Sequence, residues 1–293
     1  MLTIGILGTA KNTGKTTALN SVLKCLNDKK IAITSIGFDG EDLDHVTGLP
    51  KPKVVVDEGT LVITSEQAAR HSTAKLELIE KLSLRTPMGR ICVYRVKELG
   101  TAVLVGPNSS DDLFEVMKRL GSYSIDVLVI DGAINRMVPF QYADYVIIAT
   151  GAARTTNLSE LIVEARLMVK AFMLPEQDGK DRVSLSGVIS VEKLQSYLGK
   201  PLLLESPIHL ILADNYRKLE EQLEKLDIAV KRKPKLLCVT VNPCYPERRV
   251  EGYQLSKIDI SEVVDALKKE LKVTCIDVNK EENVLCEVLQ RCT

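Results

Sequence analysis

The chain has 293 residues, 45% of them hydrophobic, which is enough for one large α/β domain or two smaller ones. Lys plus Arg and Asp plus Glu are equal at 39 each, so the overall charge argues against nucleic acid or an anionic membrane as a partner. The seven cysteines contain no CxxC pair and accompany only three histidines, which argues against a Cys/His metal site. We interpret these cysteines as buried or incidental thiols of a reducing cytosol.

The sequence shows neither a leader pattern nor a membrane span. Its first apolar run, residues 2–7, has no charged segment before it and ends at Gly8. No later segment approaches the ~18 uninterrupted apolar residues of a transmembrane helix. We therefore expect a soluble, cytoplasmic protein that does not bind membranes.

Strand-like and helix-like segments alternate along the chain. Apolar runs predict strands at 2–7, 31–36, 125–130, 145–149, 185–190, 202–212, 236–241 and 273–278. Helical spacing of apolar residues predicts helices at 16–27, 65–81, 108–121, 157–172, 215–226 and 260–271. This alternation predicts an α/β fold with a doubly wound, mainly parallel sheet.

Two segments have the pattern of β-hairpins. Residues 53–64 would turn at 57–59, and residues 90–106 would turn around 98–100. We expect them to form an antiparallel flap inserted at 47–105 into a single domain of residues 1–293. Residues 200–293 would form a C-terminal extension of the same sheet.

The segment "GTAKNTGKTT" follows the first predicted strand and begins the first predicted helix. It approximates the phosphate-loop pattern GxxxxGK[ST], except that the first glycine position falls on Thr9. In such a loop the backbone N–H groups and the helix N-terminus bind phosphates, Lys15 contacts the β- and γ-phosphates, and the Thr16 hydroxyl binds Mg²⁺. The predicted nucleotide contacts are Thr9, Ala10, Lys11, Asn12, Thr13, Gly14, Lys15, Thr16 and Thr17. The alternative is an ordinary glycine turn capped by Thr13.

Carboxylates follow two other predicted strands. Asp131 ends the run "IDVLVID", where phosphate-loop proteins place an Asp of the Mg²⁺ shell. Asp39 and Glu41 lie in the acidic turn after the strand at 31–36, where a carboxylate would orient the metal or the attacking water. We take Asp39, with Lys15, as a candidate catalytic residue, and an ordinary acidic turn is the alternative for 39–41.

Asn242 and Pro243 end a late strand in "VTVNPCYP", and the chain contains no Asn-Lys-x-Asp motif for guanine. This loop is similar to the base-contacting Asn/Pro loop of dethiobiotin-synthetase-like proteins, which implies adenine. A plain turn is the alternative. Arg154, after the strand at 145–149, is a further candidate for contact with phosphate or else a solvated side chain.

The motifs as a group resemble a known family. "TGLPKP" (47–52), "EGTLVIT" (58–64), "TPMG" (86–89), "GPNSS" (106–110) and "VIDGAINR" (129–136), with the loop at 8–17, look like the P-loop subunit of the reactivating factor for adenosylcobalamin-dependent lysine 5,6-aminomutase and ornithine 4,5-aminomutase. The resemblance covers about the first 190 residues. It implies an ATP- and Mg²⁺-dependent ATPase, slow without its partner, that works with a second reactivase subunit to remove damaged cobalamin from a B12-dependent aminomutase.

Three functions remain open from the sequence. The first is this reactivase-type ATPase. The second is an ATP-dependent ligase or kinase resembling dethiobiotin synthetase, and the third is a partitioning-type ATPase that acts on DNA or surfaces. Lys11 lies near the position of the signature lysine of partitioning ATPases, so a homodimer in which Lys11 reaches across the interface also stays open. The tail "EENVLCEVLQRCT" is not basic, which disfavours the third function.

Overall fold

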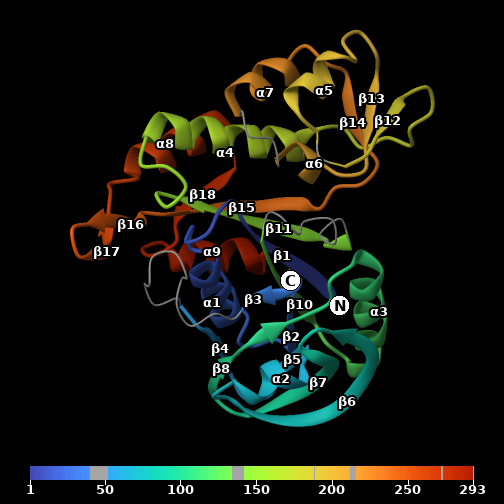
Figure 1. The fold of residues 1–293 in the computed structure, drawn as a ribbon, viewed down its shortest axis with the longest axis vertical. Coiled ribbons are helices and arrows are strands. Elements are labelled where there is room, and N and C mark those ends of the chain that lie inside the picture. Colours follow the sequence, from blue (N-terminus) through green and yellow to red (C-terminus); the bar gives the residue numbers. More distant parts are fainter. Residues whose placement is uncertain (40–51, 134–141, 188, 212–215, 272, 293) are drawn as a thin grey trace.

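The computed structural model describes residues 1–39, 52–133, 142–187, 189–211, 216–271 and 273–292. Its centre is a nine-stranded sheet in the order β18-β15-β11-β1-β10-β2-β5-β7-β6 (Figure 1). The strands from β18 to β5 are parallel, whereas β7 and β6 pair antiparallel at one edge. These strands are β1 (Leu2–Gly8), β2 (Ile31–Ser35), β5 (Leu61–Ser65), β6 (Lys75–Thr86), β7 (Gly89–Glu98), β10 (Val127–Ala133), β11 (Tyr145–Gly151), β15 (Lys235–Asn242) and β18 (Thr274–Asp277).

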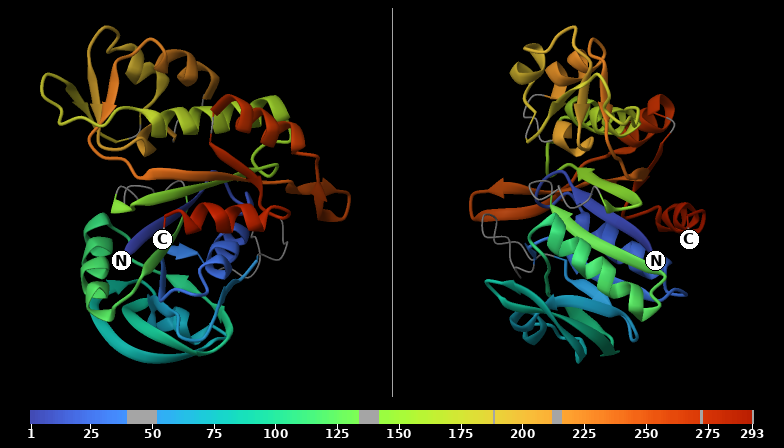
Figure 2. Two further views of the ribbon diagram at one scale, coloured as in Figure 1. Left: turned by 180° about the vertical axis from the view of Figure 1, so that it is seen from behind. Right: turned by 90° about the vertical axis from the view of Figure 1, so that its right-hand side faces the viewer.

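Helices cover both faces of this sheet (Figure 2). One core contains Ile4 and Ile6 of β1 together with Leu19 and Leu285, from the helices α1 (Lys15–Cys25) and α9 (Glu282–Gln290). The other core contains Leu7, the next residue of β1, with side chains of α3 (Ser110–Leu120), α4 (Leu158–Met173) and α8 (Ser261–Leu271). Successive side chains of a strand point to opposite faces, so both faces of β1 are buried. The predicted α/β fold with a doubly wound, mainly parallel sheet is confirmed.

The two hairpins predicted within 47–105 are wrong. β4 (Val54–Val56) pairs antiparallel with β8 (Gly100–Ala102), and β5 enters the central sheet beside β2. The short strands β3 (Phe38–Asp39) and β9 (Leu104–Val105) pair with each other. The turn residues between neighbouring segments suggest that these segments pair with each other. β5 is buried at every position, however, and a strand buried on both faces is more stable inside the sheet than in an exposed hairpin.

The helix predicted at 65–81 is also wrong beyond its first turns. α2 (Glu66–Arg70) is a short helix capped by Ser65, whose Oγ accepts a hydrogen bond from the Ala68 N–H at 3.3 Å. From Lys75 the chain becomes β6, which forms a hairpin with β7. The Leu-, Glu- and Lys-rich sequence of β6 suits a helix, so non-local pairing with β7 overrides local propensity here.

Residues 183–230 build a second, smaller sheet, seen at the top of Figure 1. It consists of the parallel strands β12 (Val183–Leu185), β13 (Leu202–Leu204) and β14 (Ile228–Val230), with the helices α5 (Val191–Gln195), α6 (Ile208–Ile211) and α7 (Tyr216–Leu223). The strand predicted at 202–212 therefore ends early. Pro207 cannot donate to a strand ladder, and the chain enters α6 directly after it. Within residues 200–293, β15 and β18 join the nine-stranded sheet, whereas β13 and β14 do not.

Three further features complete the description. A two-stranded ribbon of β16 (Cys244–Arg249) and β17 (Gly252–Lys257) projects from the body, and the short 3₁₀ helix η1 (Gly121–Tyr123) follows α3 (Figure 1).

Cys25 and Cys286 form a disulfide between α1 and α9, which corrects the interpretation of all cysteines as thiols. Among the described residues, no helix is both long and apolar enough to span a membrane.

Candidate functional site

The predicted site residues converge at one edge of the central sheet. Parallel strands place their carboxyl ends on the same edge, so the ends of β1, β10, β2, β11 and β15 meet there. Asp131 of β10 stands in register with Ile6 of β1 on one side and with Ser35 of β2 on the other. The loop at 9–14 leaves β1 at this same edge and leads into α1. The topology therefore brings the loop and Asp131 together.

The loop has a conformation suited to presenting its backbone N–H groups. Asn12 and Gly14 adopt left-handed backbone angles, with φ of 64° and 85°. Gly14 is the N-cap of α1 and has no side chain with which to cap the helix, and the first turn of α1 holds no acidic residue. Thr13 does not cap α1, because its Oγ1 donates to the carbonyl of Ala10 at 3.0 Å. The helix N-terminus thus keeps its positive end for an anion.

Lys15 and Asp131 form an ion pair at the centre of the site. Lys15 Nζ lies 3.0 Å from Asp131 Oδ1, and their side chains are only 12% and 3% exposed. A cation and an anion held together at low exposure are poised to exchange partners when a ligand brings both negative phosphates and a cation. The pairing brings two of the predicted site residues together at the sheet edge, from α1 and β10.

Thr9 anchors the start of the loop to the neighbouring strand. Its N–H donates to the Ala149 carbonyl at 3.0 Å, and its Oγ1 hydrogen-bonds to Thr150 Oγ1 at 3.1 Å. Thr9 and Thr150 are both buried. Where the consensus loop has glycine, this chain therefore uses a buried threonine pair that ties β1 to β11.

Asn242 packs directly against the loop. Its Nδ2 donates to the Asn12 carbonyl at 3.2 Å, while its Oδ1 accepts from Asn279 Nδ2 at 3.1 Å and from the Cys244 N–H at 3.2 Å. A Cβ added at Gly14 would lie 2.8 Å from Asn242 Cβ, so only glycine fits there. Sequence reasoning missed Asn279, since nothing local marks a residue after β18 as a neighbour of this loop.

The other predicted residues fall into three groups. Thr16 and Thr17 lie half-buried in the first turn of α1, and Lys11 is exposed on the loop. Pro243 is buried beyond Asn242, where its carbonyl accepts from the Ile258 N–H at 3.1 Å. The backbone of Asp39 pairs with Leu104 in β3–β9, but its side chain and all of Glu41 lie outside the described residues.

Arg154 lies in the turn after β11 and is held by α4. Its Nε lies 3.1 Å from Glu164 Oε1, and the Glu164 side chain is only 3% exposed. The Ala152 N–H of the same turn donates to the Asn242 carbonyl at 2.9 Å. The sequence offered phosphate contact or solvation for Arg154. The structure shows an ion pair with Glu164, while the Arg154 side chain is still 36% exposed.

Oxygen donors at the site fit a magnesium ion. The Thr16 hydroxyl on α1 and the Asp131 carboxylate at the end of β10 are the hard oxygen ligands that Mg²⁺ prefers, and such ions often use only one or two protein ligands beside phosphates. Among the described residues, no group of three or more His, Cys, Asp or Glu side chains could hold a metal by itself.

Comparisons with known proteins give only distant structural matches. No family model and no curated protein matches the sequence. Among solved structures, cobyrinic acid a,c-diamide synthase from Mycobacterium smegmatis, with bound ATP analog and magnesium, matches with a TM-score of 0.37 and 12% identity over 99% of this chain and 92% of that one. A nucleotide-binding protein from Archaeoglobus fulgidus in complex with ADP matches with a TM-score of 0.33 and 13% identity over 98% and 86% of the two chains. The MinC:MinD cell division protein complex from Aquifex aeolicus matches with a TM-score of 0.34 and 13% identity, over 99% of this chain and 86% of that one. These scores and identities are too low to indicate a shared function.

Proposed function

We propose that this chain is a P-loop ATPase that binds ATP and Mg²⁺ at residues 9–17. The observation that carries the proposal is the Lys15–Asp131 ion pair between the start of α1 and the end of β10. In this arrangement the uncapped helix N-terminus and the left-handed loop backbone would bind the phosphates. Lys15 would leave Asp131 for the β- and γ-phosphates.

Asp131 and Thr16 would hold Mg²⁺ in the proposed complex. When bound, the ion would neutralise part of the phosphate charge. With Lys15 turned toward the phosphates, the buried Asp131 carboxylate would be available as a ligand of Mg²⁺. The Lys15–Asp131 ion pair thus compensates two charges that are both little exposed.

Asp39 remains our candidate for orienting the attacking water, with Glu41 as the neighbouring alternative. The preceding backbone supports this place in the fold, since the Gly37 N–H donates to the Pro107 carbonyl at 2.9 Å and the Ser35 Oγ donates to the Gly37 carbonyl at 2.7 Å. These bonds hold the exit of β2 at the sheet edge that carries Asp131. A change in this segment with the state of the nucleotide would then be transmitted to β9 and the strands beyond.

We propose adenine as the base. Asn242 and Pro243 lie beside the loop, and the sequence lacks the guanine-reading Asn-Lys-x-Asp motif. The Asn242 amide is bonded to Asn12 and Asn279, so we expect it to set the shape of a base pocket as well as to contact the base. A competition of ATP against GTP in a binding assay tests this, and a preference for GTP contradicts it. Without the Asp of that motif to pair with its N1–H and N2–H, guanine should bind less tightly by about 1–3 kcal/mol.

The sequence resemblance supports a finer proposal, namely that the ATPase is the nucleotide-driven subunit of a cobalamin-exchanging reactivating factor. Its partners would be a second reactivase subunit and a B12-dependent aminomutase. A homodimer, in which the exposed Lys11 contacts the other copy's nucleotide, is compatible with this role. The test adds this protein, its partner subunit, ATP·Mg²⁺ and fresh adenosylcobalamin to an inactivated aminomutase. Recovery of activity that needs Lys15 supports the proposal, whereas ATP turnover with a small carboxylate or diamine substrate and no recovery favours a ligase.

The nucleotide site itself is tested by thermal unfolding. At an ATP·Mg²⁺ concentration of about 100 times Kd, binding should stabilise the wild type by about 2.7 kcal/mol, or several degrees in Tm. Lys15→Ala should lose most of this shift, because it removes the charge on the β- and γ-phosphates. Lys24→Ala is the matched control, since Lys24 lies on the same helix but is 72% exposed near its other end. Equal shifts in wild type and Lys15→Ala would reject the site.

A further inference from the structure

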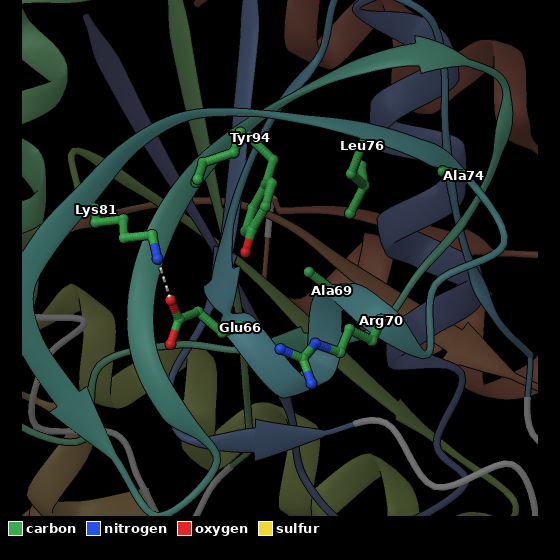
Figure 3. Close-up of a pocket in the computed structure, with 8 residues that line it drawn as sticks. Glu66, Ala69, Arg70, Ala74, Leu76, Lys81 and Tyr94 are labelled. Atoms are coloured by element: carbon green, nitrogen blue, oxygen red, sulfur yellow. Dashed lines mark ion pairs between the residues drawn. The ribbon is translucent and has the colours of Figure 1, made fainter.

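A second cavity lies between α2 and the β6–β7 hairpin, away from the phosphate loop. Its volume is about 320 Å³, at the lower end of the range of small-molecule sites. Figure 3 shows Tyr94 of β7 above it, Arg70 and Ala69 of α2 below it, and Leu76 of β6 beside it. β5 runs parallel to β2, so α2, which follows β5, begins at the same sheet edge as the phosphate loop, which follows β1. β5 and β1 are three strand spacings apart in the sheet, or about 14 Å. A ligand there would be separate from the nucleotide phosphates.

The charged groups at this cavity leave one cation available. Glu66 and Lys81 pair with each other, with Lys81 Nζ 2.9 Å from Glu66 Oε1. A hydrogen bond from Lys81 lowers the pKa of Glu66, so this carboxylate stays ionised at neutral pH. Arg70 is exposed and, among the described residues, no carboxylate oxygen lies within ion-pair distance of its guanidinium. The cavity therefore has an excess of one positive charge.

Tyr94 adds a hydrogen-bond donor next to that charge. The residue is only 8% exposed, and Figure 3 shows its hydroxyl pointing into the space between Glu66 and Arg70. Burial raises the pKa of the Tyr94 phenol, so the hydroxyl keeps its proton at neutral pH. A guanidinium and a phenolic O–H facing one space form a suitable pair of donors for a carboxylate.

The rest of the lining is apolar. Ala69, Ala74, Leu76 and Leu78 complete the wall, and Leu78 is 45% exposed although it is a large hydrophobic side chain. An exposed leucine at the rim of a cavity gains by contact with an apolar group of a ligand. An inorganic anion could contact the Arg70 guanidinium and the Tyr94 hydroxyl, but it would leave the apolar side chains of the wall exposed to water.

We propose that this cavity binds a small carboxylate that carries a short apolar group. The carboxylate contacts the Arg70 guanidinium and the Tyr94 hydroxyl, and the apolar group lies against Leu76 and Leu78. The Glu66–Lys81 pair closes one end of the site. This site is independent of the proposed nucleotide function and is tested without nucleotide.

The test uses hexanoate as the probe and ligand-observed NMR as the measurement on the full chain. Hexanoate should bind, whereas hexylamine, with the same apolar chain and the opposite charge, should bind at least about tenfold more weakly. Acetate should also bind more weakly than hexanoate, because it has the carboxylate but too little apolar surface to use the apolar wall. Equal affinity of hexanoate and either comparison compound overturns the proposal.

Two variants locate the binding. Arg70→Gln should weaken hexanoate about tenfold or more, since the charged partner of the carboxylate is removed. Arg95→Gln is the matched control, because Arg95 follows Tyr94 on β7 and points to the opposite face of the hairpin. Tyr94→Phe keeps the ring and should weaken binding by a smaller factor. Equal effects of Arg70→Gln and Arg95→Gln place the ligand elsewhere and reject the site.

Discussion

Asn242 lies so close to Gly14 that its Cβ occupies the space beside the missing side chain, at 2.8 Å from where a Cβ at Gly14 would stand. The two residues come from the end of β15 and the start of α1, and the Asn242 amide also bonds to Asn12 of the same loop. The glycine is therefore required for two reasons. One is its left-handed backbone, with φ of 85°, and the other is the contact with Asn242.

Gly14→Ala should lower stability by roughly 1–3 kcal/mol and remove the Tm shift with ATP·Mg²⁺, because both the backbone and the packing are strained. In the background of Asn242→Gly the same substitution should cost less, since the contact with Asn242 Cβ is gone and only the backbone strain remains. A double-mutant cycle by chemical unfolding measures the difference. Additive effects would show that the contact does not matter.

Asp131→Asn should separate metal use from nucleotide binding. Without the carboxylate, Mg²⁺-dependent ATP hydrolysis should fall, while metal-free ATP should bind about as well as to wild type. The variant should also unfold more easily, by up to about 3–5 kcal/mol, because the little-exposed Lys15 loses its anion. Asp126→Asn is the control, since Asp126 is exposed just before the same strand and its side chain accepts a hydrogen bond from the Lys30 N–H at 2.9 Å. Unchanged hydrolysis in Asp131→Asn would remove it from the metal shell.

The disulfide between Cys25 and Cys286 should stabilise the fold by linking the end of α1 to α9. It closes a loop of 261 residues, and constraint of the unfolded chain contributes about 2–5 kcal/mol. Reductant should therefore lower the Tm of wild type, and Cys25→Ser should show the lower value without reductant. Cys244→Ser, at a half-buried free thiol, should behave like wild type in both conditions. A Tm insensitive to reductant would mean that this bond does not stabilise the protein.

The ion pairs of Glu220 should make the free energy of unfolding depend on pH in the acidic range. Burial disfavours its charge, but Arg166 and Lys170 of α4 together hold the pKa of Glu220 below its ordinary value of 4.5. A lowered pKa in the folded state contributes stability above about pH 4.5 that is lost as the pH falls through the folded-state pKa. Glu220→Gln should therefore cost roughly 1–3 kcal/mol at pH 7 and almost nothing near pH 2.

Unfolding of wild type and Glu220→Gln between pH 2 and pH 7 measures this difference directly. Glu221→Gln is the matched control, because Glu221 is the adjacent carboxylate on α7 and no ion pair is recorded for it among the described residues. The difference between wild type and Glu220→Gln should shrink below about pH 4.5. A gap of constant size across the whole range would show that the ion pairs are not its source.

Much of the central architecture could be predicted from the sequence alone. Buried parallel strands are continuous apolar runs, and the helices between them have apolar residues at helical spacing, so β1, β10, α1 and α3 lie close to their predicted ranges. The sequence indicates residues 9–17 and Asp131 as a candidate site because they lie where such strands end. Strand ends in a parallel sheet meet at one edge, so their proximity follows from the topology.

Only the tertiary structure decided what depends on contacts between distant segments. The short strands at 54–56 and 100–102 pair across more than 40 residues, and the helix-prone β6 becomes a strand because β7 offers it partners. Nothing local predicts that Asn279 supports Asn242, that Arg154 meets Glu164, or that Arg70 and Tyr94 face one cavity. The spacing of apolar residues along the sequence indicates which side of a helix or strand is buried. The identity of the neighbour that buries it is set by the free energy of the whole packed chain.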